Sequence, residues 1–279
     1  MIQNKHTTTF KPLLIAVFAT ITTLSFLTGC EDSSNLSELC HQNQEICHEF
    51  SEDSWCKKQR IDVALARIAV KENNLDKDKY RLILGYEGYI RCMELASQIQ
   101  HIKLKEKTTL RKNNLLKAKA NLSELTAKNS NSKHPHLLYY YWSREGNKAS
   151  LAEFLALEGT PELENSIAQY NLATYYIKRN SKKALGFIFH SLELHEPGTS
   201  ITPEVFQSLT TIFTKRKQYK QAYIWLRAYQ LSLDKPDETI ELSLHNYQET
   251  HALDESFLDA VASTTLDKIK SGNFVSPKF

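Results

Sequence analysis

The chain has 279 residues, with 35 basic and 32 acidic side chains and a formal net charge of +3. Two of the lysines lie in the first 29 residues, which contain no acidic side chain, so 33 basic and 32 acidic residues remain beyond that segment. A balance this close to neutral excludes a chain-wide basic footprint for nucleic acid. Glycine is rare, at 8 residues, and runs of alternating β-branched residues are absent, so we expect an all-α fold.

Residues 1–29 have the pattern of an export signal. Lys5 and Lys11 precede an uncharged run that ends at Leu27 and is shorter than the about 20 apolar residues of a membrane span. The following Leu27-Thr28-Gly29-Cys30 resembles the lipobox of bacterial lipoproteins, in which the signal is cut before a cysteine that receives a lipid. We therefore expect Cys30 to be the lipidated first residue of an exported protein.

The residue that follows a lipidated cysteine indicates in which membrane the lipoprotein is anchored. Asp at the next position is typical of retention at the inner membrane, whereas this chain has Glu31. We therefore expect attachment to the outer membrane, with the protein facing the periplasm. Residues 30–36 read as a tether, and no second apolar run beyond them is long enough to span a bilayer.

Four further cysteines lie in the next region, residues 37–128, and an even number in an oxidising compartment predicts two disulfides. A helix over 55–71, with Ile61, Leu65 and Ile68 on one face, is followed by Asn73-Asn74 and a second helix. One face of the second helix carries apolar residues at alternating spacings of four and three: Leu82, Tyr86, Tyr89, Met93 and Ala96. Residues of two such antiparallel helices face each other when their numbers sum to about 148. Cys56 and Cys92 meet this condition, which leaves Cys40 to pair with Cys47.

A metal site is the alternative for these cysteines, because His41 and His48 each follow one of them. Zinc sites usually contain cysteine pairs separated by two to four residues, whereas six residues separate Cys40 from Cys47. The spacing favours the disulfides, and we expect no metal and no cofactor.

We expect the second helix to continue to about Lys128, with seven basic residues between positions 103 and 119. One interpretation is a basic stripe that contacts anionic lipid or cell-wall polymer. The favoured interpretation is a solvated helix face, with four leucines turned inward: Leu104, Leu110, Leu115 and Leu116.

Residues 134–235 repeat themselves after a polar loop at 129–132. Leu138, Leu172 and Leu209 are 34 and 37 residues apart, and each precedes a large apolar or aromatic residue, a polar turn and an alanine. The alanines are Ala149, Ala184 and Ala222. A small residue facing a large one lets two helices approach closely, and stacked pairs then bury a continuous core. These units resemble the tetratricopeptide repeat, a helix–turn–helix of about 34 residues.

The sequence pattern after residue 235 predicts a C-terminal helix pair over 236–272 and a loose tail over 273–279. Asp237 and Asp254 are candidate helix caps, and Gly272 is placed to end the second helix. Several motifs also resemble an uncharacterised family of Gram-negative envelope lipoproteins, whose activity is unassigned. They are Leu39-Cys40, Ser54-Trp55-Cys56, Tyr89-Ile90-Arg91-Cys92, residues 136–144 and Ala222-Tyr223-Ile224-Trp225.

No hydrolase, zinc-protease or phosphate-binding motif occurs in the sequence. His134-Pro135-His136 could bind a metal, but two histidines around a loop proline are more often incidental. Aromatic clusters at 139–142 and 175–176 could line a groove, although about half of each should be core, because consecutive helical residues point in different directions. We therefore expect a protein that is not an enzyme.

The resemblance to tetratricopeptide lipoproteins implies a membrane-anchored scaffold or adaptor that holds another envelope protein or peptide. The alternative is an envelope structural protein that contacts peptidoglycan or lipid through residues 103–119, and a cell-wall enzyme is the third candidate. In tetratricopeptide repeats, one groove position lies six residues after the first leucine. Here that position is Arg144, Lys178 and Lys215, a ladder of cations suited to an acidic partner.

Overall fold

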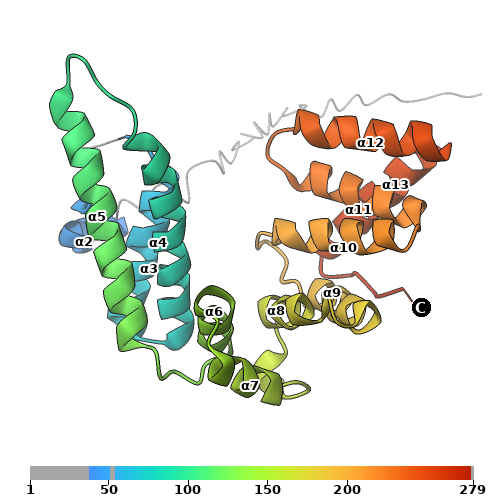
Figure 1. Ribbon diagram of the computed structural model, residues 1–279, viewed down its shortest axis with the longest axis horizontal. Helices are drawn as coiled ribbons and strands as arrows, with labels where there is room; N and C mark the ends of the chain where they lie inside the picture. Colours follow the sequence, from blue (N-terminus) through green and yellow to red (C-terminus); the bar gives the residue numbers. More distant parts are fainter. Residues whose placement is uncertain (1–37, 51–53, 278–279) are drawn as a thin grey trace, which may run out of the picture.

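The computed structural model describes residues 38–50 and 54–277 of the chain. Every regular element in these ranges is helical, which confirms the all-α prediction. The helices form two lobes, α2–α5 and α8–α13, which α6 and α7 connect (Figure 1). The signal segment, Cys30 and the tether lie outside the described residues. Within the described ranges, no helix combines the length and the apolar character needed to cross a bilayer.

The N-terminal lobe is a disulfide-linked helical bundle. It contains α2 (Gln44–His48), α3 (Lys57–Asn73), α4 (Asp76–Ala96) and α5 (Lys105–Lys128). α3 and α4 pack as the expected antiparallel hairpin. Cys56 joins Cys92 with their Cα atoms 5.9 Å apart, and Cys40 joins Cys47 at 5.5 Å. Both predicted pairings are therefore confirmed.

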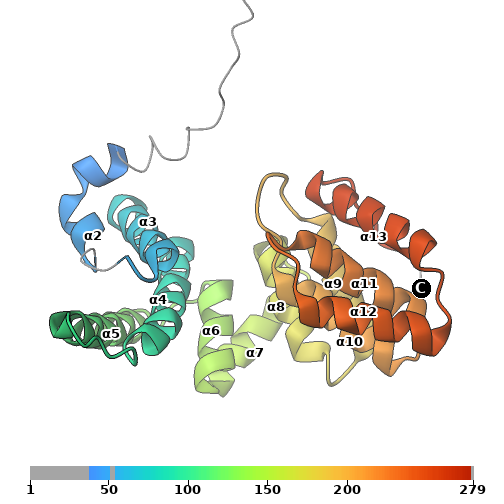
Figure 2. The same cartoon turned by 90° about the horizontal axis from the view of Figure 1, so that it is seen from above.

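The prediction that the second helix runs to Lys128 is wrong. The chain reverses over residues 97–104, and α5 returns against α4 (Figure 2). The reversal places Ala118 in one core with Met93 and Tyr86, with Leu122 packed against it, whereas a continuous helix would leave these surfaces in water. Leu104 and Leu116 are exposed rather than turned inward, because α5 packs through a different face.

The face predicted for α3 is also corrected. Leu65 is exposed, while Val63, Ala66 and Ile68 are buried. The small Ala66 and the β-branched Val63 lie against α4 in the core that contains Leu82. The apolar residues of α3 are compatible with either of two buried faces. The Cys56–Cys92 disulfide and the packing against α4 determine which face is buried.

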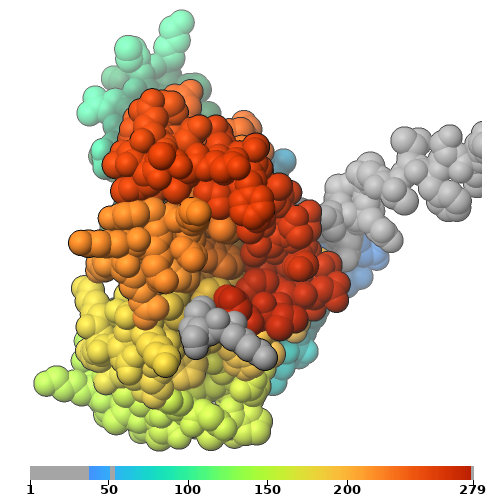
Figure 3. All heavy atoms as spheres, turned by 90° about the vertical axis from the view of Figure 1, so that its right-hand side faces the viewer, coloured from blue at the N-terminus to red at the C-terminus, as the bar shows by residue number. Residues whose placement is uncertain are grey.

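The remaining helices form stacked helix–turn–helix units. The pairs are α6 (Pro135–Glu145) with α7 (Lys148–Ala156), α8 (Ser166–Tyr176) with α9 (Ser181–Glu193), and α10 (Pro203–Lys215) with α11 (Tyr219–Ser232). They lie in chain order, one layer on the next (Figure 3). Ala184 and Ala222 are fully buried, as their predicted packing role requires. In the first unit Ala149 is exposed, and the buried small residue is Ser150, one position later.

The two C-terminal helices are α12 (Glu238–His251) and α13 (Glu255–Lys270), and both pack against α11. Their predicted caps are confirmed. The Asp237 side chain accepts hydrogen bonds from the backbone N–H groups of Thr239 and Ile240, and Asp254 accepts one from Phe257. A capping carboxylate satisfies N–H groups that have no partner inside the helix.

The prediction of a loose tail is wrong for the described residues 273–277. Phe274 is 9% exposed and packs in the largest core, with its ring centroid 6.2 Å from that of Phe189 and 6.3 Å from that of Trp225. The backbone N–H of Ser276 donates to Glu193 Oε1 at 2.7 Å. The chain end therefore closes the core between α9 and α11.

Phe274→Ala should lower the free energy of unfolding by about 3 kcal/mol, because it removes a buried ring and leaves a cavity. Urea denaturation followed by circular dichroism measures this change. The matched control is Val275→Ala, since Val275 is 79% exposed and its truncation should cost less than about 0.5 kcal/mol. Equal effects of the two substitutions would contradict the docked tail.

Candidate functional site

The turns between the paired helices, from the α6–α7 turn to the α12–α13 turn, lie along one edge of the helix stack. Three contacts join successive turns. The Trp142 and Tyr175 rings lie 5.7 Å apart, Arg216 Nη2 donates to Ser181 Oγ at 3.0 Å, and the Tyr219 ring stacks on His251 at 3.5 Å. Each contact links one unit to the next, so residues distant in sequence share this edge.

This edge concentrates positive charge. The first three turns (144–148, 178–183 and 215–220) contain ten basic residues and one acidic residue, Glu145. We call these three turns the basic edge. The basic residues are Arg144, Lys148, Lys178, Arg179, Lys182, Lys183, Lys215, Arg216, Lys217 and Lys220. The fourth turn, between α12 and α13, carries Asp254 and Glu255 and does not continue it.

Local turn chemistry fixes the backbone of the basic edge. Gly146 has a φ of +69° and ends α6, and the Asn147 side chain then caps α7 by accepting from two backbone N–H groups. Asn180 caps α9 by accepting a hydrogen bond from the backbone N–H of Lys183. Lys217 has a φ of +59°, a left-handed conformation that is unusual for a residue with a side chain. Cations at the helix C-termini are also favoured by the helix dipole, which explains part of the pattern.

The structure places the three predicted groove residues on this edge but gives them different environments. Arg144 Nε donates to Glu87 Oε1 on α4 at 3.0 Å, and this hydrogen bond raises the pKa of Arg144. Arg144 therefore ties the repeats to the N-terminal lobe. Lys178 and Lys215 are exposed, and neither makes a hydrogen bond or ion pair with any residue that the structure describes.

Two other cations of the basic edge are engaged inside the lobe. Lys183 Nζ pairs with Glu158 at 2.5 Å and donates to the Tyr176 hydroxyl at 2.9 Å. The Arg179 guanidinium lies 4.1 Å from the centroid of the Tyr175 ring. These contacts hold both side chains against half-buried rings. An external anion would therefore be bound by the other cations of the basic edge.

Four exposed cations of the basic edge were missed by sequence reasoning, which counted only one position in each repeat. They are Lys148, Lys182, Lys217 and Lys220, and none forms an ion pair with a described residue. The sequence could have identified these four lysines, because each predicted turn or its flank contains a cluster of basic residues. With Lys178 and Lys215, they give six cations positioned to bind negative groups by charge-assisted hydrogen bonds.

The aromatic residues beside the basic edge divide between core and surface. Tyr140 and Tyr141 are buried, whereas Tyr139, Trp142 and Tyr175 are half-buried. The half-buried rings meet edge to face, with 5.6 Å between the centroids of Tyr139 and Trp142. They pack the first two units together and support the backbone of the basic edge.

Among the residues considered as metal ligands, the cysteines and His136 have other roles in the described part of the chain. The cysteines form the two disulfides. His136 stacks on Tyr80 with ring centroids 5.0 Å apart, and burial, together with the nearby His134, lowers its pKa to about 4. No group of three or more His, Cys, Asp or Glu side chains in the described ranges could hold a metal ion.

His136 should make the fold sensitive to acid. Its pKa is about 6.5 in the unfolded chain and about 4 in the folded protein, so the unfolded state binds the proton first. Stability should therefore fall as the pH drops from 6.5 to 4, by up to about 3 kcal/mol from this residue. Urea titrations at pH 7 and pH 4 measure the loss. His136→Phe should show a smaller loss than wild type, and equal losses would contradict this assignment.

The seven basic residues between positions 103 and 119 do not form one exposed stripe in the structure. Arg111 is buried and donates to the carbonyl oxygen of Ala96 at 3.1 Å, while Lys117 pairs with Glu49 and Lys119 with Glu94. These three cations stabilise the N-terminal lobe. The other four lie near the start of α5: Lys103, Lys105, Lys107 and Lys112.

Comparison with known proteins adds a family but no activity. The model of the family described as "Protein of unknown function (DUF2989)" matches residues 27–227. Among curated proteins and among solved structures, no chain matches this one at a significant level. The matched segment takes in the N-terminal lobe and most of the three repeat units, and it ends within α11. Because it covers well over half of the residues, the chain belongs to the DUF2989 family.

Proposed function

We propose that the protein is an envelope lipoprotein, anchored at Cys30, whose repeats hold an acidic segment of another envelope protein or peptide at the basic edge. The export pattern and the lipobox-like Leu27–Cys30 support the anchor and a periplasmic location, with Glu31 favouring the outer membrane. The helix–turn–helix stack supports a scaffold, because stacked units offer a long, regular surface to a partner. The partial resemblance of the repeat units to tetratricopeptide repeats also supports a scaffold.

The single observation that carries the partner's chemistry is the charge of the basic edge. Ten basic residues and one acidic residue lie on one edge, although the whole chain has a formal net charge of only +3. Six of the cations make neither a hydrogen bond nor an ion pair with any residue that the structure describes. An acidic peptide segment supplies carboxylates at a spacing that a flexible chain can adapt, and its binding should weaken as salt increases.

Reversing three charges of the basic edge should abolish recovery of the partner. Lys148, Lys182 and Lys220 are exposed and lie in the first turns of α7, α9 and α11. Glutamate is favoured by the dipole in the first turn of a helix, so Lys148→Glu, Lys182→Glu and Lys220→Glu should together preserve or raise the melting temperature. Crosslinking in cells, followed by affinity purification of the protein, measures which proteins are recovered.

The matched control makes the same charge change in the first turns of α3 and α4, with Lys57→Glu, Lys58→Glu and Lys77→Glu, at three exposed lysines outside the basic edge. Wild type and this control should recover the same partner, and the basic-edge variant should lose it while melting normally. Equal recovery with both variants would place the partner on another surface. Recovery of a partner that lacks acidic segments would contradict the proposed chemistry.

A further inference from the structure

The turn between α4 and α5 exposes apolar side chains at the free end of the N-terminal lobe. We call residues 95–112 the hairpin tip, which lies at the end of α4 and α5 remote from α6 (Figure 1). Ile102 is 90% exposed and Leu95 is 71% exposed, and Ile99 and Leu104 are exposed beside them. Large apolar side chains gathered on a surface indicate an interaction site, whereas single ones do not.

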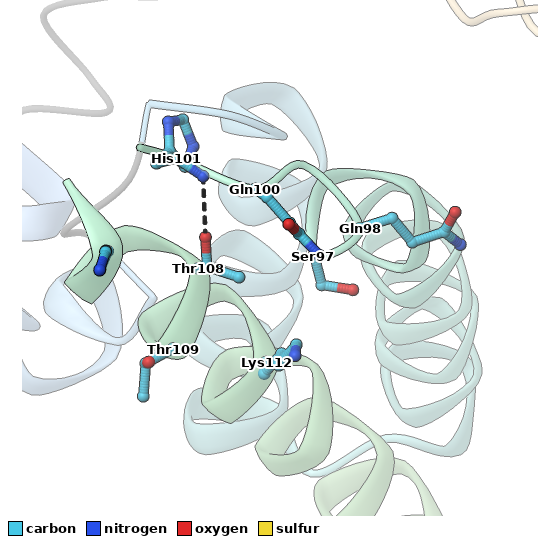
Figure 4. A pocket seen from close by; sticks show the side chains of 8 residues that line it. Ser97, Gln98, Gln100, His101, Thr108, Thr109 and Lys112 are labelled. Carbon is cyan, nitrogen blue, oxygen red and sulfur yellow. Dashed lines mark hydrogen bonds between the residues drawn. The ribbon is translucent and has the colours of Figure 1, made fainter. Parts of the chain in front are cut away.

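Hydrogen bonds hold the hairpin tip in shape. The backbone N–H of His101 donates to Thr108 Oγ1 at 3.4 Å (Figure 4). The Thr108 hydroxyl donates in turn to the carbonyl oxygen of Ile99 at 3.2 Å. Arg111 fastens the end of α4 through the carbonyl of Ala96. A turn held by hydrogen bonds therefore positions the apolar side chains at the surface. An open polar depression lies beside them, with Ser97, His101 and Lys112 in its lining.

The same tip carries unpaired positive charge. Lys103, Lys105, Lys107 and Lys112 make no hydrogen bond or ion pair with any described residue. Glu106 is the one acidic residue between positions 97 and 112. Lysines around exposed aliphatic side chains match a bilayer surface, where anionic headgroups attract the ammonium groups and the acyl boundary receives the apolar ones.

We propose that the hairpin tip contacts the anionic headgroup layer of the bilayer, with Ile102 inserted at the acyl boundary. This inference rests on the proposed anchor at Cys30, which would keep the tip near one membrane. Each basic residue near an anionic surface strengthens attachment roughly fivefold. The lysines and Ile102 thus add a second attachment that fixes how the anchored protein is oriented.

The chain between Cys30 and the described residues is long enough for this contact. Eight residues, 30–37, can extend about 28 Å. α2 lies beside the middle of the bundle, where Glu49 pairs with Lys117 at 2.8 Å (Figure 1). Lys117 is about 18 Å along α5 from Lys105 at 1.5 Å per residue. The opposite end of the bundle leads into α6, so the tip is the end free to meet the bilayer.

Photocrosslinking in cells tests this contact on the full chain. Benzoylphenylalanine replaces Ile102 in one variant and Phe257, an exposed apolar residue of α13, in the control. After irradiation, the membrane fraction is measured and the purified protein is analysed by mass spectrometry. We expect phospholipid adducts at position 102 and not at 257. Lys103→Glu, Lys105→Glu and Lys107→Glu should together remove them, with unchanged circular dichroism.

The other outcomes separate this inference from the proposed function. Membrane-bound protein without a lipid adduct at position 102 overturns the tip contact and leaves the anchor standing. Adducts at 102 to a protein or to a cell-wall glycan overturn it in favour of those partners. Equal lipid adducts at 102 and 257 overturn a specific contact. Protein absent from the membrane fraction overturns both the anchor and the tip contact.

Discussion

Cys30→Ala should abolish the incorporation of labelled palmitate and leave the export signal uncut by the lipoprotein peptidase. The expected effect is complete, because the proposed lipid would be attached through a thioether to the cysteine thiol and alanine offers no nucleophile. Lipid labelling and the increase in mass from the retained 29 residues measure the result. An acyl chain contributes about 0.8 kcal/mol for each buried CH₂ group, so the mature wild-type protein should remain membrane-bound in high salt.

The control for this change is Cys47→Ser, which removes a cysteine that the structure places in a disulfide. This variant should be labelled and processed normally. Palmitate incorporation into Cys30→Ala would contradict the lipoprotein assignment. Separation of the membranes by density then tests the effect of Glu31, for which we expect wild-type protein in the outer-membrane fraction.

Removal of the Cys56–Cys92 disulfide should produce the largest loss of stability among the changes considered. The bond spans 36 positions, and in the chain-entropy model its closure restricts the unfolded chain by about 4 kcal/mol. Paired Cys56→Ser and Cys92→Ser should therefore lower the free energy of unfolding by about this amount, as urea denaturation would measure. Cys56 is also buried against α4, so the serine adds a polar group to that core.

The second disulfide provides the comparison, because it closes a much shorter loop. Cys40 and Cys47 are 7 positions apart, which the same model equates with about 2.5 kcal/mol. Paired Cys40→Ser and Cys47→Ser should therefore cost less. A larger loss from the short loop than from the long one would contradict the view that Cys56–Cys92 is the principal covalent link of the N-terminal lobe.

Those features that depend on local sequence could be predicted. The helical period of the second hairpin helix placed Tyr86, Tyr89 and Met93 on its buried face, and all three are buried. The caps Asp237 and Asp254 followed from side chains that satisfy nearby backbone N–H groups. The disulfide pairing followed from one geometric condition on two antiparallel helices.

Features that depend on distant contacts could not be predicted. The reversal at 97–104 contains neither glycine nor proline, so no breaker marks it, and the packing of α5 against α4 determines it. Phe274 follows Gly272 outside any periodic pattern, yet it fills space left by Phe189 and Trp225. Long-range burial decides such segments, and local propensity does not.

The candidate site was predictable in part for the same reason. Lys178 and Lys215 could be found because repeat spacing locates helix ends. The role of Arg144 could not be foreseen, since its partner Glu87 lies 57 positions earlier, on a helix of the other lobe. Lys148 and Lys182 lie ten residues after the first leucine of their units, and Lys220 lies eleven residues after, so the same repeat spacing locates them at the start of each second helix. The contacts between successive turns bring these cations onto one edge.

Site-specific photocrosslinking from position 178 tests whether the basic edge binds an acidic segment of another envelope protein. Benzoylphenylalanine replaces Lys178 on the basic edge of the full chain, and cells are irradiated with and without the Lys148→Glu, Lys182→Glu and Lys220→Glu changes. Without the three charge reversals, we expect a discrete protein adduct, with the crosslink mapped to an acidic segment of the partner. With the three charge reversals, this adduct should be lost. A protein adduct unaffected by the three charge reversals, or none at position 178, would contradict binding at the basic edge.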